Sequence, residues 1–161
     1  MTQPKPATVA RIYHYLLGGT HYFPADRTVA EALLTLHPDT ARLARANRAF
    51  LNRAVGYLAG RGVRRFLDIG CGLPAHPNVH DITDTLTDDS RVVYVDVDPV
   101  AVSQYQELLD KHPRASAIYG DLTHPHAILN HPQTRRMLTP GEPIAVLLTA
   151  VLHHLPDHNV Y

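Results

Sequence analysis

Apolar residues recur at helical spacing through about the first sixty residues of the chain. In the first segment, positions 9, 12, 13, 16 and 17 are apolar, and the pair Gly18-Gly19 ends the pattern. Asp26 can cap a second helix, and Pro38-Asp39 opens a third helix that is rich in Arg and Ala. The pattern predicts three helices, over residues 7–17, 26–36 and 38–60.

From residue 65 onward, short apolar runs alternate with helical segments. The runs are apolar on both faces, as strands must be in a parallel sheet that helices cover on both sides. We expect strands over 65–69, 91–96, 115–119 and 143–149, and helices over 78–86, 98–111 and, with a break, 125–138. This order predicts a doubly wound, mostly parallel α/β core over residues 63–161, preceded by a helical cap over residues 1–62.

The composition is that of an ordinary globular domain, with 45% hydrophobic and 19% charged residues. The sequence shows neither a signal sequence nor an apolar run long enough to cross a membrane, so we expect a soluble, cytoplasmic protein without a membrane partner. The single cysteine, Cys71, cannot form an internal disulfide, which fits a reducing compartment.

The formal net charge is zero, and nothing in it indicates a nucleic-acid partner. The charges are nevertheless unevenly placed: residues 1–66 hold ten Lys and Arg against three Asp and Glu, whereas residues 67–161 hold five against twelve. A basic helical front could therefore dock on an acidic core or supply a positive field over a cleft. Solvated faces that happen to segregate would explain the same pattern.

The run FLDIGCGLP, residues 66–74, reads as a short strand that enters a turn with two glycines. Gly70 and Gly72 would sit at the carboxyl end of that strand, where ligands bind in open parallel sheets, and glycine lets a ligand touch the main chain. GCGLPA also fits the G-x-G-x-x-A form of the nicotinamide-dinucleotide fingerprint. Asp68 argues against that ligand, because a carboxylate beside the turn repels a pyrophosphate. We expect a cationic ligand without phosphate.

Two further carboxylates follow the next two predicted strands. Asp96 ends the second strand, 24 residues after Gly72, where an acid can accept hydrogen bonds from ribose hydroxyls. Asp121 follows the third strand, where a carboxylate could accept a proton from an adenine amino group, although helix capping would also explain it. A glycine turn, an acid for ribose and an acid for adenine together describe a site for S-adenosylmethionine.

The motifs D-x-G-x-G, YVDVDP, GDL and LLTAVLHHLPD resemble, in this order, the first four motifs of class I S-adenosylmethionine-dependent methyltransferases. The segments ARIYHYLLGGTHYFPADRTVAEALL, ARANRAFLNRAVGYLAGRGVRRFLDIGCGLP and NVHDI resemble a bacterial S-adenosyl methyltransferase family, once catalogued as a domain of unknown function. The resemblance implies a Rossmann-like fold and methyl transfer from S-adenosylmethionine to an unknown, small-molecule acceptor. It also implies cofactor contacts from Asp68, Gly70, Gly72, Asp96 and Asp121, and from Tyr15, Gly18, Gly19 and Asn47 in a helical lid.

Class I methyltransferases have a seven-stranded sheet, and this chain supplies four predicted strands. We therefore expect a chain truncated after the fourth strand, which keeps the cofactor crevice and lacks the region that shapes the acceptor pocket. The fourth strand would become an apolar edge, which invites a homodimer. The alternative function is thus a catalytically inactive cofactor-binding module, completed by a partner or a second copy. A nicotinamide-dependent oxidoreductase is the third hypothesis.

Few residues are candidates for direct chemistry. His153 and His154 follow the fourth strand and could act as a general base if the acceptor must lose a proton. The other histidines lack Asp, Glu or Cys partners at convincing spacing, so we expect no metal. Cys71 has no histidine at a defined spacing to activate it. Arg42, Arg45, Arg48 and Arg53 share a helical spacing that is typical of a solvated or ion-paired face.

Overall fold

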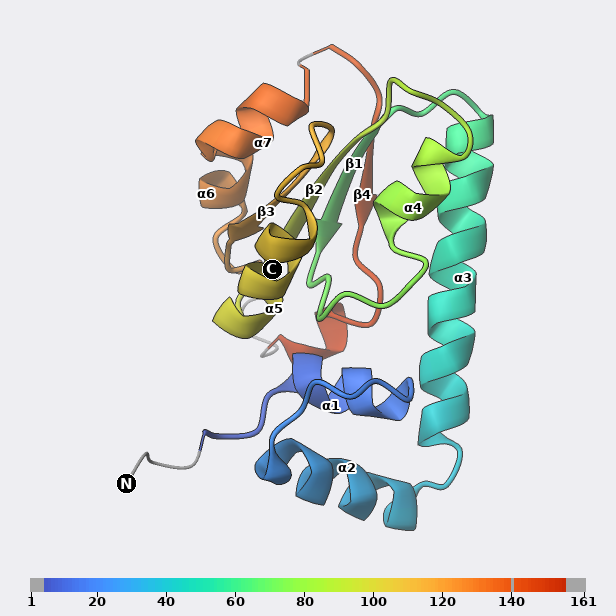
Figure 1. The fold of residues 1–161 in the computed structure, drawn as a ribbon, viewed down its shortest axis with the longest axis vertical. Helices are drawn as coiled ribbons and strands as arrows, with labels where there is room; N and C mark the ends of the chain where they lie inside the picture. The colour runs from blue at the N-terminus through green and yellow to red at the C-terminus, as the bar shows by residue number, and fades with distance from the viewer. Residues whose placement is uncertain (1–4, 140, 156–161) are drawn as a thin grey trace.

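The computed structural model describes residues 5–139 and 141–155 of the 161. Three helices precede the first strand: α1 (Val9–Leu16), α2 (Pro24–Leu36) and α3 (Thr40–Gly60). Figure 1 shows α1 and α2 lying below the sheet, while the long helix α3 runs from α2 up along one side of it. The helical front predicted from the apolar spacing is therefore confirmed.

The sheet has four parallel strands in the order β3-β2-β1-β4. The chain crosses from each strand to the next through helices, as parallel pairing requires. The strands are β1 (Arg65–Ile69), β2 (Arg91–Asp96), β3 (Ala115–Tyr119) and β4 (Ile144–Leu147), and the remaining helices are α4 (Val79–Asp84), α5 (Pro99–Leu108), α6 (Pro125–Asn130), α7 (Pro132–Met137) and the short 3-10 helix η1 (Leu152–His154). The strand order reverses between β1 and β4, so the switch point of this α/β fold lies there.

The break expected within 125–138 lies at His131, where the segment divides into two helices because Pro132 cannot continue the first and instead starts the second. One local expectation needs correction. The second helix begins at Pro24, so the expectation that Asp26 is its N-cap is wrong. Asp26 is the third residue of the first turn, and its Oδ2 accepts a hydrogen bond from the backbone N–H of Phe23 at 2.7 Å.

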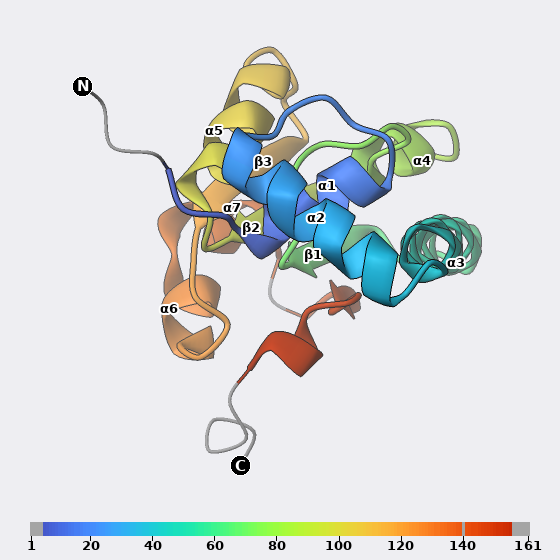
Figure 2. The same cartoon turned by 90° about the horizontal axis from the view of Figure 1, so that it is seen from below.

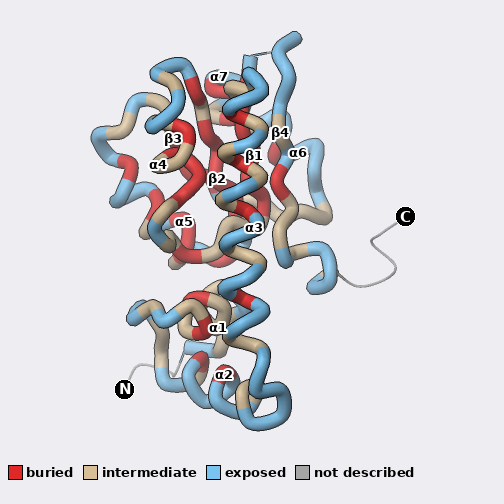
Figure 3. The backbone as a smooth tube through the Cα atoms, turned by 90° about the vertical axis from the view of Figure 1, so that its right-hand side faces the viewer, coloured by how far each residue is buried: buried red, intermediate tan, exposed pale blue. Residues whose placement is uncertain are grey.

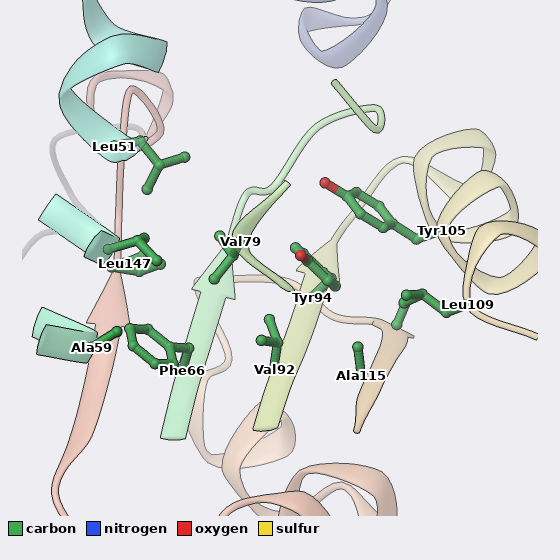
Figure 4. Close-up of a cluster of buried hydrophobic side chains, with 12 residues drawn as sticks. Leu51, Ala59, Phe66, Val79, Val92, Tyr94, Tyr105, Leu109, Ala115 and Leu147 are labelled. Carbon is green, nitrogen blue, oxygen red and sulfur yellow. The ribbon is translucent and has the colours of Figure 1, made fainter. Parts of the chain in front are cut away.

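Side chains alternate between two apolar layers along each central strand. Phe66 of β1, with Val92 and Tyr94 of β2, faces α3, α4 and α5 in the cluster drawn in Figure 4. The intervening residues face α6 and α7; they are Leu67, Ile69, Val93 and Val95. In Figure 3 the buried residues concentrate in this sheet and its helices, with a smaller buried group at α1 and α2. The expected three-layer core is confirmed.

Helix α3 belongs to both parts of the molecule. Its second half contributes Leu51, Val55 and Ala59 to the cluster on the sheet, whereas Ala44 near its start accepts a hydrogen bond from Tyr13 of α1 at 3.1 Å through its backbone carbonyl. The same helix therefore positions the cap relative to the strand ends. The division into residues 1–62 and 63–161 stays a prediction.

A buried ion-pair cluster fastens α1 to the core. Arg11 is 4% exposed, and its guanidinium lies 2.8 Å from Asp26 of α2 and 3.1 Å from Asp98, the N-cap of α5. Thr8 donates its hydroxyl to the same Asp98 carboxylate at 2.6 Å. Burial raises the pKa of Asp26, but hydrogen bonds from Arg11 and from the backbone of Phe23 and Thr8 outweigh it and hold the pKa below its usual value. Here the basic front does contact the acidic core.

The strand β4 lies at an edge of the sheet and pairs, among the described strands, only with β1. Two of its four side chains remain open to solvent, since Ile144 is 41% and Val146 52% exposed. Among the described helices, none combines the length and the apolar character that crossing a bilayer requires.

Candidate functional site

A cavity of about 380 Å³ lies between the cap and the carboxyl ends of the strands. In Figure 1 the strand arrowheads point toward α1, and Figure 2 shows α1 and α2 lying across that end. The lining comes from α1, α3, the loops after β1, β2 and β3, and the segment after β4. The volume falls in the range of small-molecule sites, and its place is the switch point of the sheet, where such folds bind ligands.

Asp68 brings a carboxylate into this cavity from β1. It follows Phe66 by two positions, so its side chain points to the same face of the sheet as Phe66, toward α3. Asp68 is 2% exposed, and burial raises the pKa of its carboxyl to about 7, with Arg48 opposing the rise and Asp96 adding to it. A cationic ligand beside this group would lower its pKa again and stabilise the ionised carboxylate.

The glycine turn is tied to the next strand through Asp96. The backbone N–H of Gly72 donates to Asp96 Oδ2 at 2.7 Å, and that of Asp98 donates to Oδ1 at 2.8 Å. Burial raises the pKa of Asp96, while these backbone donors oppose the rise. Each oxygen keeps a lone pair, so this carboxylate can accept further bonds from hydroxyl groups.

Gly70 and Gly72 both have positive φ angles, of 73° and 66°. A Cβ at Gly70 would lie 2.4 Å from Val151 Cγ2, so this glycine lets the turn pack against the segment after β4. A Cβ at Gly72 would meet no atom within 4 Å, because Gly72 lines the cavity. The space in front of Gly72 is therefore open to a ligand.

Asp121 lines the cavity from the loop after β3. Its Oδ1 accepts from the backbone N–H of Thr123 at 2.9 Å and from the Thr123 hydroxyl at 2.7 Å, and these bonds lower the pKa of the carboxyl. Oδ1 thus closes the turn before α6, while Oδ2 lies 3.7 Å from Nδ1 of His124 and keeps a lone pair for a further donor. Asp121 is not the N-cap of α6, which is His124, so the helix-capping explanation does not hold as stated, and a ligand contact stays a prediction.

Of the four cap residues expected at the cofactor, only Asn47 lines the cavity, where its Nδ2 donates to the Tyr13 hydroxyl at 2.8 Å. Gly18 and Gly19 close the C-terminus of α1 instead, since their N–H groups donate to the carbonyls of Tyr15 and His14. Tyr15 lies on the other side of α1 and donates its hydroxyl to Glu31 at 3.3 Å. The structure therefore places these three residues away from the cavity.

Thr8, Tyr13 and Arg48 are among the lining residues that the sequence does not identify as site residues. In the sequence, Tyr13 is one apolar position of a predicted helix, and Arg48 is one of four arginines at helical spacing. Asn47, Arg48 and Leu51 share one face of α3 toward the cavity, but which face of this helix meets the sheet is decided by tertiary packing.

His154 lines the cavity, whereas His153 does not. Burial, and then the neighbouring His153, lower the pKa of His154, which favours the neutral imidazole. Burial and the nearby Asp68 raise the pKa of the Cys71 thiol well above its usual value, which leaves it a poor nucleophile.

Within residues 5–139 and 141–155, no three His, Cys, Asp or Glu side chains gather in a way that could hold a metal ion.

Two solved structures resemble this chain along almost its whole length. A methyltransferase candidate from Thermobifida fusca YX has 40% sequence identity and a TM-score of 0.92, covering 95% of this chain and 58% of its own. A DUF574 family protein from Streptomyces avermitilis MA-4680 also has 40% identity and a TM-score of 0.92, covering 96% of this chain and 60% of its own. This chain thus spans about three fifths of either structure. No curated protein matches it.

A sequence profile described as S-adenosyl methyltransferase matches residues 2–160. The match extends over the glycine turn, the three carboxylates and the helical cap. The chain belongs to the S-adenosyl methyltransferase family.

Proposed function

We propose that this chain binds S-adenosylmethionine in the cavity beneath α1 and serves methyl transfer to a small-molecule acceptor. The observation that carries the proposal is the convergence of three carboxylates, Asp68, Asp96 and Asp121, from the ends of three adjacent strands in one cavity. Across β1, β2 and β3 they would meet a cationic amino-acid part, a ribose and an adenine in turn. The cofactor is elongated and carries these three parts in that order.

The protein's own contribution to methyl transfer would be binding, orientation and exclusion of water. When bound, S-adenosylmethionine supplies a methyl group already activated by a sulfonium, so strong acid or base catalysis is needed only for an acceptor that must lose a proton. His154 lines the cavity and has a lowered pKa, so it is the candidate to accept that proton. The free thiol of Cys71 fits the cytoplasm as the compartment.

Asp96→Ala is expected to weaken S-adenosylmethionine binding by about 100-fold. The variant loses the carboxylate that would accept hydrogen bonds from the ribose hydroxyls, and it leaves the N–H of Gly72 without its acceptor. Isothermal titration calorimetry of the wild-type chain, the variant and the unrelated carboxylate variant Asp110→Ala measures this loss. NAD serves as the negative ligand. Saturable binding of NAD, or equal binding of S-adenosylmethionine by wild type and Asp96→Ala, would contradict the proposal.

A second candidate is a cofactor-binding module without catalysis of its own, completed by a second copy. The exposed side chains of Ile144 and Val146 on the edge strand β4 favour it, because an apolar edge offers backbone groups and side chains to another strand. Light scattering of the purified chain is expected to give a dimer that Val146→Lys converts to a monomer. A wild-type chain that is monomeric at high concentration would rule this candidate out.

A further inference from the structure

Arg48 differs from the other arginines of its helix. Arg42 pairs with Asp39 at the surface, and Arg45 and Arg53 are exposed. Arg48 is half-buried, lines the cavity and directs Nη2 to the backbone carbonyls of Ala75 and Pro77, the latter at 2.8 Å. These carbonyls belong to the loop that follows the glycine turn. The guanidinium is therefore fixed at the end of the cavity where β1 opens.

The protein does not satisfy this guanidinium fully. Its Nε is buried without a hydrogen-bond partner among the described residues. A buried, charged donor without an acceptor is costly, and such groups are commonly completed by a ligand. The ligand part that suits an arginine is a carboxylate or a phosphate.

The neighbouring Asp68 decides between these two anions. Arg48 lowers the pKa of Asp68, so the two charges interact, yet they form no direct ion pair within the described residues. This end of the cavity therefore presents one cation and one anion that remain separate. A phosphate would be repelled by Asp68, whereas an α-amino acid carries a carboxylate and an ammonium side by side.

We infer that Arg48 binds the carboxylate of the cofactor's methionine part, while Asp68 receives its ammonium group. This inference rests on the proposed function. It adds a contact through which the protein would recognise the amino-acid part of the cofactor. The order of the strands supports it, because Asp121 and Asp96 occupy the ends of β3 and β2 and leave the end of β1 for the amino acid. Arg48 also explains how the cap contributes to cofactor binding from α3.

Two ligands that share one nucleoside separate this role from a structural one. S-adenosylhomocysteine carries the amino acid, and 5′-methylthioadenosine lacks both its carboxylate and its ammonium. For the Arg48→Met variant, calorimetry is expected to show an affinity for S-adenosylhomocysteine that is roughly 10- to 100-fold lower than in the wild type. The affinity for 5′-methylthioadenosine should stay within about twofold, because loss of a carboxylate contact cannot affect a ligand without a carboxylate.

Arg45→Met, an exposed substitution on the same helix, is the matched control and should change neither affinity. Circular dichroism melting shows whether Arg48→Met folds; if it does not, Arg48→Lys carries the test, with a smaller selective loss for S-adenosylhomocysteine. Equal losses for both ligands would overturn the inference, since Arg48 would then act only on the loop. If the folded wild-type chain bound neither S-adenosylhomocysteine nor 5′-methylthioadenosine, the proposed function itself would be overturned.

Discussion

Asp68→Asn should make the ligand-free protein more stable at pH 8 and at the same time remove most of its affinity for S-adenosylmethionine. In the folded chain the pKa of Asp68 is raised from 3.8 to about 7 by burial. Between these values the folded state holds a proton that the unfolded chain has released, so the free energy of unfolding falls as the pH rises through this window. The full gap corresponds to about 4 kcal/mol, which asparagine avoids because it does not ionise.

Urea unfolding of both proteins from pH 4.5 to pH 8 measures this effect, with Asp110→Asn at an exposed position as the control. The difference in stability between Asp68→Asn and wild type should grow with pH and level off above the raised pKa. Affinity for S-adenosylmethionine should rise with pH in the wild type only, since the cation requires the ionised carboxylate. Parallel pH profiles in the two proteins would show that Asp68 does not titrate as described.

Arg11→Met should be the most damaging substitution in the cap. Arg11 is the cation for two buried carboxylates, Asp26 and Asp98, which are 0% and 6% exposed. Removing it leaves both anions buried without their partner, a loss of about 3–5 kcal/mol in the free energy of unfolding. The arginine's contact with the N-cap of α5 also means that the cap should detach from the core before the sheet unfolds.

Chemical denaturation followed by far-UV circular dichroism measures the loss, and hydrogen exchange of the α1 amides shows where it acts. The matched control is Arg27→Met, because Arg27 pairs with Glu31 on the exposed surface of α2. Surface pairs of this kind contribute little, so the unfolding midpoint should not move. If Arg11→Met behaved like Arg27→Met, the buried cluster would not be what holds the cap on the core.

Most of the fold followed from hydrophobic periodicity and from strong helix signals. The runs 65–69, 91–96 and 115–119 were apolar on both faces, and the structure places strands over the same residues. Asp98 and Pro99 marked the start of α5 because a cap and a proline act locally. Pro132 gives a less definite signal, since a proline within a helical pattern can kink a helix or begin a new one.

The same distinction applies to the site: residues marked by local sequence signals could be predicted, and residues placed by tertiary packing could not. Asp68, Asp96 and Asp121 could be found because each stands at a strand end, and parallel strands bring their carboxyl ends to one edge. Arg48 and Tyr13 could not, because their roles depend on how α1 and α3 meet the sheet. Nothing local distinguishes the arginine that faces the cavity from its three neighbours on the helix.

Amide chemical shifts test the central claim most directly, because they locate the ligand on the folded chain. On titration with S-adenosylhomocysteine, the largest changes in a ¹H–¹⁵N correlation spectrum should fall on Gly72, Asp98 and Thr123, whose N–H groups bond to Asp96 and Asp121. A second cavity at the amino ends of the strands, lined by Arg65, Arg91 and His112 among others, provides the contrasting location. Changes centred there, or none at saturating ligand, would contradict the account.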